Sequence, residues 1–306
     1  MEKKNNNPAK ISSISQFHSL LKLPKPLHPM ISLVDNTQLV INADLTNTAF
    51  LLDLYKISYK FSTNGKMGYG QDYYDFNEGG LMFASPNQLI ITDPEEGVEY
   101  GGYTLLFHPD FIRNYPLGKS IKKYGFFSYD TNEALHLSDS EKKTIVGLLT
   151  SIDNELHTAI DEMSQDVIVS YIDVLLNYSN RFYKRQFITR KTVSNDLLLK
   201  VEDTLDTYIN NAETLKRGLP SVDFLASQVN VSSHYLSDML RNLTGQNAQQ
   251  HIHSKLIEKS KDFLMTTNLS VAEIAYQLGF EYPQSFSKLF KKKTNLTPLE
   301  FKNSLN

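Results

Sequence analysis

The chain has 306 residues, of which 41% are hydrophobic and 21% are charged, and it contains no cysteine. This length suffices for two compact domains, and the composition is that of a globular protein rather than a disordered one. The lack of cysteine excludes disulfides, thiolate zinc sites and a cysteine nucleophile. Because no apolar run approaches the roughly 18 residues of a spanning helix and the first ten residues are polar, we expect a cytoplasmic protein without a signal peptide.

The first third of the chain has the pattern of short β-strands. Between residues 30 and 109, apolar runs at 50–54, 88–92 and 103–107 alternate with turn residues such as Asn64-Gly65 and Gly101-Gly102. Evenly spaced strands with such turns predict a β-sandwich or a small β-barrel. The tail before residue 30 is expected to be loosely ordered at its start.

Beyond Phe127 the pattern becomes helical. Ser138 and Glu141 form a capping box that opens a helix, and one apolar face follows at three- and four-residue steps. That face consists of Ile145, Leu149, Ile152, Leu156 and Ile160. A second helix is predicted over residues 165–183, and the two helices would either cover the β domain or pair with a second subunit. The basic stretch 181–191 is expected to be a solvated linker rather than a nucleic-acid contact.

One segment near the C-terminus occurs twice. Residues 225–230 align with 274–279 at an offset of 49, and Leu236 aligns with Phe286 at an offset of 50. Each copy predicts a short helix, a tight turn at a residue that tolerates positive φ (Asn230 or Gly279), and a second helix. A single helix-turn-helix pattern is a weak signal, whereas its repetition is much less easily accidental.

A long helix is predicted between the two copies, over residues 247–267. Its inward face is expected to carry Ala248, Ile252, Leu256, Ser260 and Phe263/Leu264. Twenty-one helical residues span about 30 Å, close to the roughly 34 Å of one turn of B-DNA. The second helices of the two units would therefore meet successive major grooves, and a stiff helix between them must fit the DNA pitch or bend the DNA.

We expect the second helix of each unit to contact DNA with the face opposite its apolar positions. The predicted contact residues are Ser232, Ser233, His234, Ser237, Asp238, Arg241, Tyr282, Gln284, Ser285, Lys288, Lys291 and Lys292. Gln284 suits adenine, and Lys288 suits guanine or phosphate. Ser232 and Tyr282 stand at helix N-terminal ends, which bind phosphate, whereas Lys291 and Lys292 suit the DNA backbone or solvent.

The formal net charge of −3 counts against DNA binding. The charge is unevenly distributed, however. Residues 1–194 hold 19 Lys and Arg against 22 Asp and Glu, whereas residues 221–306 hold 9 against 7, a net charge of +2. The small basic excess lies in the segment that carries the repeat.

The C-terminal segment resembles the AraC/XylS family of bacterial transcription regulators. The resemblance rests on residues 270–280, residues 285–292 and Thr297-Pro298 followed by Phe301, and it is specific over about residues 221–306. Residues 105–111, 126–129 and 177–187 are more loosely similar to a Bacteroidetes subgroup. The resemblance implies a cupin-like β-barrel sensor, helices that often dimerise, and a C-terminal part that binds DNA.

The chain departs from the family pattern at four positions. They are Asp238, Lys255, Ser260 and Asn295, where the family commonly has a basic residue, Arg, Ala and Gly. Asp238 is the most informative, because a carboxylate repels phosphate but accepts a hydrogen bond from the amino group of cytosine. We expect an altered base preference at this position.

These observations predict an α+β chain in three parts. They are a β-rich, cupin-like sensor domain (1–130), a helical connector and dimerisation region (131–194), and an all-α domain with two helix-turn-helix units (195–306). The predicted function is sequence-specific transcription regulation by a homodimer on double-stranded DNA. The expected partners are a small-molecule effector and, for an activator, RNA polymerase. No enzyme activity, cofactor, metal or membrane contact is expected.

Two alternative functions remain open. One is a helix-turn-helix protein that assembles complexes without reading DNA sequence. The other is a cupin-type metabolic enzyme with a helical appendage, which would need a metal cluster within residues 30–110, where His108 is the one histidine available. His251 and His253 stand two residues apart on the predicted helix and are interpreted as surface residues. The aromatic stretch 55–76 fits core packing better than a ligand pocket.

Overall fold

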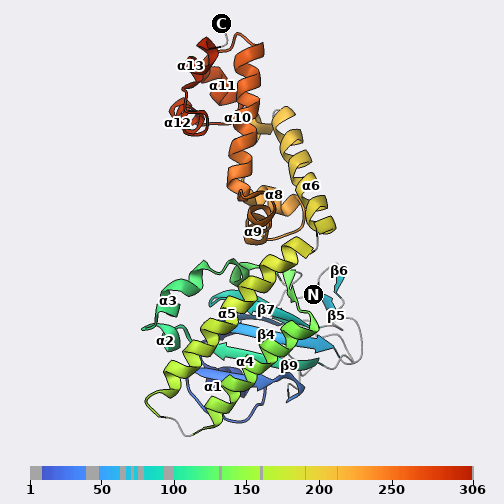
Figure 1. The fold of residues 1–306 in the computed structure, drawn as a ribbon, viewed down its shortest axis with the longest axis vertical. Helices are drawn as coiled ribbons and strands as arrows, with labels where there is room; N and C mark the ends of the chain where they lie inside the picture. The colour runs from blue at the N-terminus through green and yellow to red at the C-terminus, as the bar shows by residue number, and fades with distance from the viewer. Residues whose placement is uncertain are drawn as a thin grey trace, which may run out of the picture. The chain divides into compact units, whose positions relative to one another are not determined.

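A computed structural model describes residues 9–38, 48–62, 67–69, 72–74, 79–92, 100–130, 133–158, 161–189, 191–211 and 213–304. The chain divides into two compact units, Met1–Gln186 and Phe187–Asn306. All strands within the described ranges belong to the first unit, and the second is helical (Figure 1). The division assigns most of segment 131–194 to the same unit as the strands, while the three-part organisation itself stays a prediction.

The first unit contains an antiparallel five-stranded sheet in the order β10-β7-β4-β9-β2, a three-stranded sheet in the order β1-β3-β8, and the pair β5-β6. The strands are β1 (Ala9–Ile11), β2 (Ile31–Asp35), β3 (Thr48–Leu52), β4 (Tyr55–Ser62), β5 (Met67–Tyr69), β6 (Asp72–Tyr74), β7 (Gly80–Ala84), β8 (Gln88–Thr92), β9 (Tyr100–Phe107) and β10 (Leu135–His136). The apolar runs predicted as strands lie in or overlap β3, β8 and β9.

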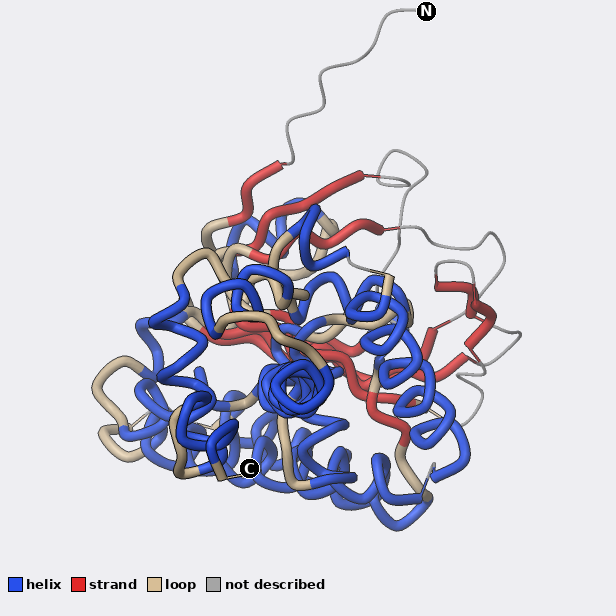
Figure 2. The backbone as a smooth tube through the Cα atoms, turned by 90° about the horizontal axis from the view of Figure 1, so that it is seen from above, coloured by secondary structure: helices blue, strands red, loops and turns tan. Residues whose placement is uncertain are grey.

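The predicted closed barrel is not seen among the described strands, which form separate sheets. One reason lies at the edge strand β10, which pairs with β7 on one side. On the other side, the Gln186 side chain accepts a hydrogen bond from His136 N at 2.8 Å and donates one to Ala134 O at 3.3 Å. A side chain therefore occupies the edge where a closing strand would pair. The sandwich alternative agrees with two facing sheets, and in Figure 2 β1 lies in a layer apart from the larger sheet.

Helices α4 (Asp139–His157) and α5 (Ser164–Thr189) cover one face of the five-stranded sheet (Figure 1). Tyr55 stacks on Phe107 at 5.1 Å, and Phe83 lies 5.5 Å from Phe127, both as ring-centroid distances. Tyr55 and Tyr59 are buried, so core packing is confirmed for these two members of the aromatic stretch. The side chains of Tyr69, Tyr73, Tyr74 and Phe76 lie outside the described residues.

The opposite face of this sheet packs against the three-stranded sheet and α1 (Ile14–Leu20). The buried residues between them are Ile11, Ile14, Phe17, Val34, Phe50, Leu52, Leu54 and Leu106. Strand β1 and helix α1 lie in the N-terminal segment, where no element was predicted. Helix α1 begins after Ser13, whose hydroxyl accepts a hydrogen bond from Gln16 N at 3.2 Å, so a capping signal was present.

The capping box of α4 and its buried face are confirmed from Ile145 to Leu156, while Ile160 lies outside the described residues. The predicted linker at 181–191 is wrong for residues 181–189, because α5 continues to Thr189. Two facts explain the longer helix. Phe182, Tyr183 and Phe187 extend its buried stripe, and Arg185 is used in an ion pair instead of facing solvent alone.

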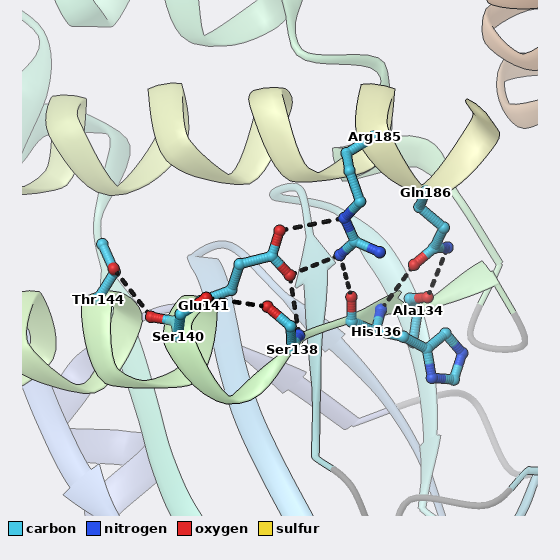
Figure 3. A network of polar contacts seen from close by, with 8 residues as sticks. All are labelled: Ala134, His136, Ser138, Ser140, Glu141, Thr144, Arg185 and Gln186. Atoms are coloured by element: carbon cyan, nitrogen blue, oxygen red, sulfur yellow. Dashed lines mark hydrogen bonds and ion pairs between the residues drawn. The ribbon is translucent and has the colours of Figure 1, made fainter. Parts of the chain in front are cut away.

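A polar network holds the end of α5 against β10 and the start of α4 (Figure 3). The Arg185 guanidinium binds both carboxylate oxygens of Glu141, at 2.6 and 3.1 Å, and donates to His136 O at 2.8 Å. Glu141 also accepts from Ser138 N at 2.8 Å within the capping box. Because bidentate Arg–carboxylate geometry is directional, the network fixes the position of α5 along its axis as well as its distance from the sheet.

Two short α-helices and three 3₁₀ helices connect these elements within the described part of the first unit. They are η1 (Asn36–Gln38), α2 (Pro109–Ile112), α3 (Pro116–Ser120), η4 (Ile121–Lys123) and η5 (Gly125–Ser128). The aromatic rings of η5 contribute to the core, since Phe126 stacks on Tyr183 of α5 with a centroid distance of 5.4 Å. The chain between β9 and β10 therefore fastens α5 to the sheet.

The second unit is built around the long helix α10, with a second long helix, α6, beside it and shorter helices packed at its two ends (Figure 1). Its helices are α6 (Lys191–Asn210), α7 (Glu213–Arg217), α8 (Val222–Gln228), α9 (Ser233–Thr244), α10 (Ala248–Thr266), α11 (Val271–Gln277), α12 (Pro283–Thr294) and α13 (Pro298–Asn303). Within the described parts of both units, no helix combines the length and apolar character needed to cross a membrane.

Candidate nucleic-acid interface

The two repeated segments form two helix-turn-helix units, α8–α9 and α11–α12, with matching turns. In the first, Asn230 has φ +55° and Val231 N donates to Ala226 O at 3.1 Å. In the second, Gly279 has φ +86° and Phe280 N donates to the equivalent oxygen, of Ala275, at 3.0 Å. A residue in the left-handed region is needed to reverse the chain this tightly, so the predicted turn is confirmed in both units.

The second helices begin differently. Ser232 caps α9 by accepting a hydrogen bond from Tyr235 N at 3.2 Å, whereas Tyr282 precedes α12 without a side-chain cap and Pro283 occupies the first turn. Proline suits this position because its missing N–H would lack a helical partner. The additional residue between Gly279 and Tyr282 accounts for the change of offset from 49 to 50.

The repeat extends further than the sequence comparison indicated. Helices α9 and α12 both end at a left-handed residue, Gly245 with φ +78° and Asn295 with φ +63°. The next helix begins in each case with a capping box, headed by Asn247 or Thr297. The departure at Asn295 is thereby explained, because asparagine is among the few non-glycine residues that adopt this conformation readily. The polar residues at 247 and 297 were the signal that could have revealed this part of the repeat.

Helix α10 joins the units with 19 residues, or about 28 Å. Its predicted inward face is confirmed, since Ala248, Ile252, Leu256, Ser260 and Leu264 are all buried. No helix was predicted over the residues of α6, which contacts α8, α9 and α10. Lys255 of α10 forms an ion pair with Asp206 of α6 at 2.7 Å, and that bond raises the pKa of Lys255. Lys255, where the chain departs from the family pattern, thus has an ion-pair partner in α6.

In the first helix-turn-helix unit, α8–α9, some of the predicted contact residues already form bonds within the protein. His234 and Arg241 are exposed, while Ser232, Ser233, Ser237 and Asp238 are partly buried. The Ser233 hydroxyl donates to Asp223 of α8. Asp238 accepts from the Arg241 guanidinium at 2.7 Å. The carboxylate and the guanidinium therefore neutralise each other along one side of α9.

In the second helix-turn-helix unit, α11–α12, the predicted contact residues are more exposed to solvent. Tyr282 is 59% exposed, and the others are exposed as well: Gln284, Ser285, Lys288, Lys291 and Lys292. None of these side chains forms a hydrogen bond or ion pair within the described part of the chain. The ammonium groups of Lys288, Lys291 and Lys292 thus form no ion pair among the described residues, although Lys291 lies near enough to Glu300 to lower the pKa of that carboxyl.

The histidines of α10 are less exposed than the sequence indicated. His251 and His253 are partly buried. His251 Nε2 lies 2.7 Å from the Thr244 hydroxyl, and His253 Nε2 lies 2.9 Å from the Gln249 amide. Burial lowers the pKa of both, and the charge of Lys293 lowers each further. The end of α12 thus lies close enough to the first turns of α10 for its lysines to affect these histidines. No cluster suited to a metal occurs among the described residues.

The turn of the second unit packs directly on the loop before α8. A Cβ placed at Gly279 would lie 2.7 Å from the Gly218 carbonyl carbon and 3.0 Å from Leu219 N. Beside it, the Thr214 hydroxyl donates to Gln277 O at 2.6 Å, and the Tyr208 hydroxyl of α6 donates to Gly218 O at 3.1 Å. Backbone contact at this distance requires glycine at position 279 for space as well as for its φ angle.

Comparisons with known proteins agree with this geometry. Residues 225–304 match the family described as "Helix-turn-helix domain". An uncharacterised HTH-type transcriptional regulator in the cgkA 5′ region of Pseudoalteromonas carrageenovora is 35% identical over 86 residues, 28% of this chain and 51% of that protein. The chain therefore spans about half the length of that relative. The uncharacterised HTH-type transcriptional regulator YfiF of Bacillus subtilis is 24% identical over 261 residues, 81% of this chain and 76% of that protein. The crystal structure of ToxT from Vibrio cholerae is 17% identical with a TM-score of 0.31, covering 90% of this chain and 94% of that one.

The two turn residues allow a matched test of the close approach. Gly279→Ala should destabilise the helical unit by about 2–4 kcal/mol, because it adds left-handed strain and a clash with the Gly218 backbone. Asn230→Gly keeps the left-handed turn of the first unit and should change stability by less than about 1 kcal/mol. Urea unfolding of the full-length variants, followed by circular dichroism, measures both. Equal stability of Gly279→Ala and the wild type would contradict the role of the contact.

Proposed function

Through residues 225–304 the chain belongs to the AraC type of helix-turn-helix transcription regulators, and from this membership we propose that it binds a specific operator in double-stranded DNA and regulates transcription there. The observation that carries the proposal is the pair of matching units joined by α10. Helices α9 and α12 would enter successive major grooves, since α10 is close to one turn of B-DNA in length.

The two helix-turn-helix units would contribute differently to DNA binding. Lys288, Lys291 and Lys292 of α12 supply charge for phosphates, and Gln284 on the same helix suits adenine. In α9, Asp238 already pairs with Arg241, so this helix adds little net attraction to the DNA backbone. A carboxylate held in this way accepts from a cytosine amino group. Affinity would come mainly from α12, with α9 adding discrimination between bases.

The proposal includes a homodimer formed through segment 141–183. The apolar faces of α4 and α5 are used against the sheet, since Ile145, Leu149, Ile172 and Leu176 are all fully buried. Pairing of two chains would therefore use their outer sides, where Val174 of α5 is 40% exposed. Two copies would double the number of DNA contacts and so compensate for the acidic charge of the whole chain.

The first unit would supply the regulatory input by binding a small effector in a cupin-like fold. It consists of two facing sheets and covering helices, an arrangement with an interior between layers. An activator would also contact RNA polymerase, whereas a repressor would act by occupying its operator. Both regulatory roles depend on DNA binding by the second unit.

Selection of sites from random double-stranded DNA with the full-length chain should enrich one sequence with two contact regions about one helical turn apart. Asp238→Asn should weaken the preference for cytosine at one position by about 1–3 kcal/mol, because an amide no longer acts only as an acceptor. The remaining positions should keep their preferences. Failure of the wild type to enrich any sequence would instead favour a protein that assembles complexes without reading sequence.

Lys288 provides a test of the α12 contact. Lys288→Ala should weaken binding to the selected operator and, for a phosphate contact, lower the log-log slope of affinity against salt by about one. Lys122→Ala, at an exposed position of η4 outside the proposed dimer segment, is the matched control and should leave both quantities unchanged. Titrations by fluorescence anisotropy at several salt concentrations measure them. Unchanged affinity and slope in Lys288→Ala would remove this residue from the interface.

The oligomeric state tests the dimer independently of DNA. Light scattering of the full-length protein at micromolar concentration should give about twice the chain mass of 34.9 kDa. Val174→Lys should shift the mass toward one chain, because it places a charge on the apolar outer side of α5. A wild-type protein that stays monomeric at this concentration would contradict the dimer.

A further inference from the structure

The face of the five-stranded sheet that looks toward the β1-β3-β8 sheet carries polar side chains within an apolar interior. Lys56 lies directly opposite Leu106 in the β4–β9 register, and Leu106 belongs to the core between the two sheets. Because alternate residues of a strand share a face, Lys56, Ser58 and Lys60 all point to this side. The central strand of the sheet therefore places two lysines toward the interior.

The hydroxyl groups in this interior satisfy one another. Ser58 and Thr104 are hydrogen-bonded at 3.0 Å, and Thr104 donates to the Asn36 side chain at 2.7 Å. Asn36 in turn donates to Tyr59 O at 3.1 Å. Ser58, Thr104 and Asn36 are all buried. The side chains of this network are two hydroxyls and one amide, so it contains no carboxylate to pair with the lysine beside it.

Lys56 forms no hydrogen bond or ion pair within the described part of the chain. Asp53 directly follows β3 of the facing sheet, and its Oδ2 pairs with Lys10 of β1 at 2.9 Å, while its Oδ1 is buried without a hydrogen-bond partner among the described residues. Burial lowers the pKa of the Lys56 ammonium to about 7, and the charge of Lys60 contributes to the shift. Taken as a whole residue, Lys56 is partly exposed.

An ammonium in an apolar interior is costly unless an opposite charge accompanies it. Such groups are concentrated where a ligand provides that charge. We propose that Lys56 binds the anionic group of a small organic molecule held between the two sheets, with the apolar part of that molecule against the surrounding core side chains. The ligand class is thus a carboxylate or phosphate with an apolar body. That this anion acts as the effector rests on the proposed function, whereas its binding does not.

Other titratable groups beside this interior are accounted for. Lys60, on the same strand, has an interaction of its own. His18 of α1 contacts Pro24 O at 2.5 Å and the Ser32 hydroxyl at 2.9 Å. Lys10 and Asp53 neutralise each other. Lys56 is therefore the residue whose substitution should remove anion binding with least effect on its neighbours.

The first test uses the melting temperature of the full-length chain without DNA. Benzoate, phenyl phosphate and benzyl alcohol are compared at constant ionic strength for the wild type, Lys56→Met and the exposed control Lys122→Met. A rise in Tm with benzoate or phenyl phosphate in the wild type and control, but not in Lys56→Met, supports the site and identifies the anionic group. Overturning results are no rise with either anion, an equal rise in Lys56→Met, or an equal rise with benzyl alcohol.

Proton uptake provides a second readout. At pH 8 a lysine with a pKa of about 7 is about 90% neutral, and an anion bound to it raises that pKa. Calorimetry of the better-binding anion in buffers of different ionisation enthalpy should therefore show uptake of up to about 0.9 proton at pH 8 and about 0.1 at pH 6. Lys56→Met should show none. Binding without Lys56-dependent uptake at pH 8 overturns the proposal.

Stability without ligand checks that Lys56→Met folds. The folded pKa of Lys56, about 7, lies below the roughly 10.4 of an unfolded chain. The charge therefore reduces stability fully below pH 7 and progressively less as the pH rises to 10. Lys56→Met should have a higher Tm than the wild type at pH 6 and a similar one at pH 10. A lower Tm at pH 6 would mean that the ammonium already has a partner and would overturn the proposal. Because none of these measurements contains DNA, they fail independently of operator binding.

Discussion

The left-handed residue in each helix-turn-helix turn sets the geometry on which the second unit depends. Asn230 and Gly279 reverse the chain within a few residues, and a backbone hydrogen bond across each turn, to Ala226 or Ala275, fixes the angle between the two helices. The apolar positions of α9 and α12 are buried only at that angle, which leaves their other faces to solvent. A change of turn conformation would alter both the core and the proposed DNA-binding surface.

The two helix-turn-helix units contact each other directly, in addition to being joined by α10. Gly279, in the turn of the second, lies against the Gly218 backbone just before the first, and α6 holds that loop through Tyr208. Thr214 adds a hydrogen bond to Gln277. These contacts restrict the motion of α8–α9 relative to α11–α12. The spacing between α9 and α12 is therefore maintained by tertiary contacts as well as by the length of α10.

The net charge of each surface depends on which charged side chains form ion pairs, as well as on composition. In α9 the Asp238–Arg241 pair cancels one basic group, and in the first unit Arg185 is committed to Glu141. The lysines at 288, 291 and 292 have no such partners among the described residues. An acidic chain can thus present a locally basic helix. In the first unit, Lys56 likewise forms no ion pair among the described residues.

The sequence by itself determined the helix-turn-helix repeat, the turn residues, the inward face of α10 and the capping box of α4, because each depends on local periodicity or on conformations that few residue types adopt. Tertiary structure decided the rest. The length of α5 depends on the Glu141 partner of Arg185, 44 residues away, and the open edge of the sheet depends on Gln186, which replaces a strand at β10. The ion pair between Asp238 and Arg241 depends on the side-chain conformations that the two residues adopt. The position of Lys56 in an apolar interior depends on the packing of two sheets face to face. Such contacts between distant residues leave no periodic trace in a single sequence.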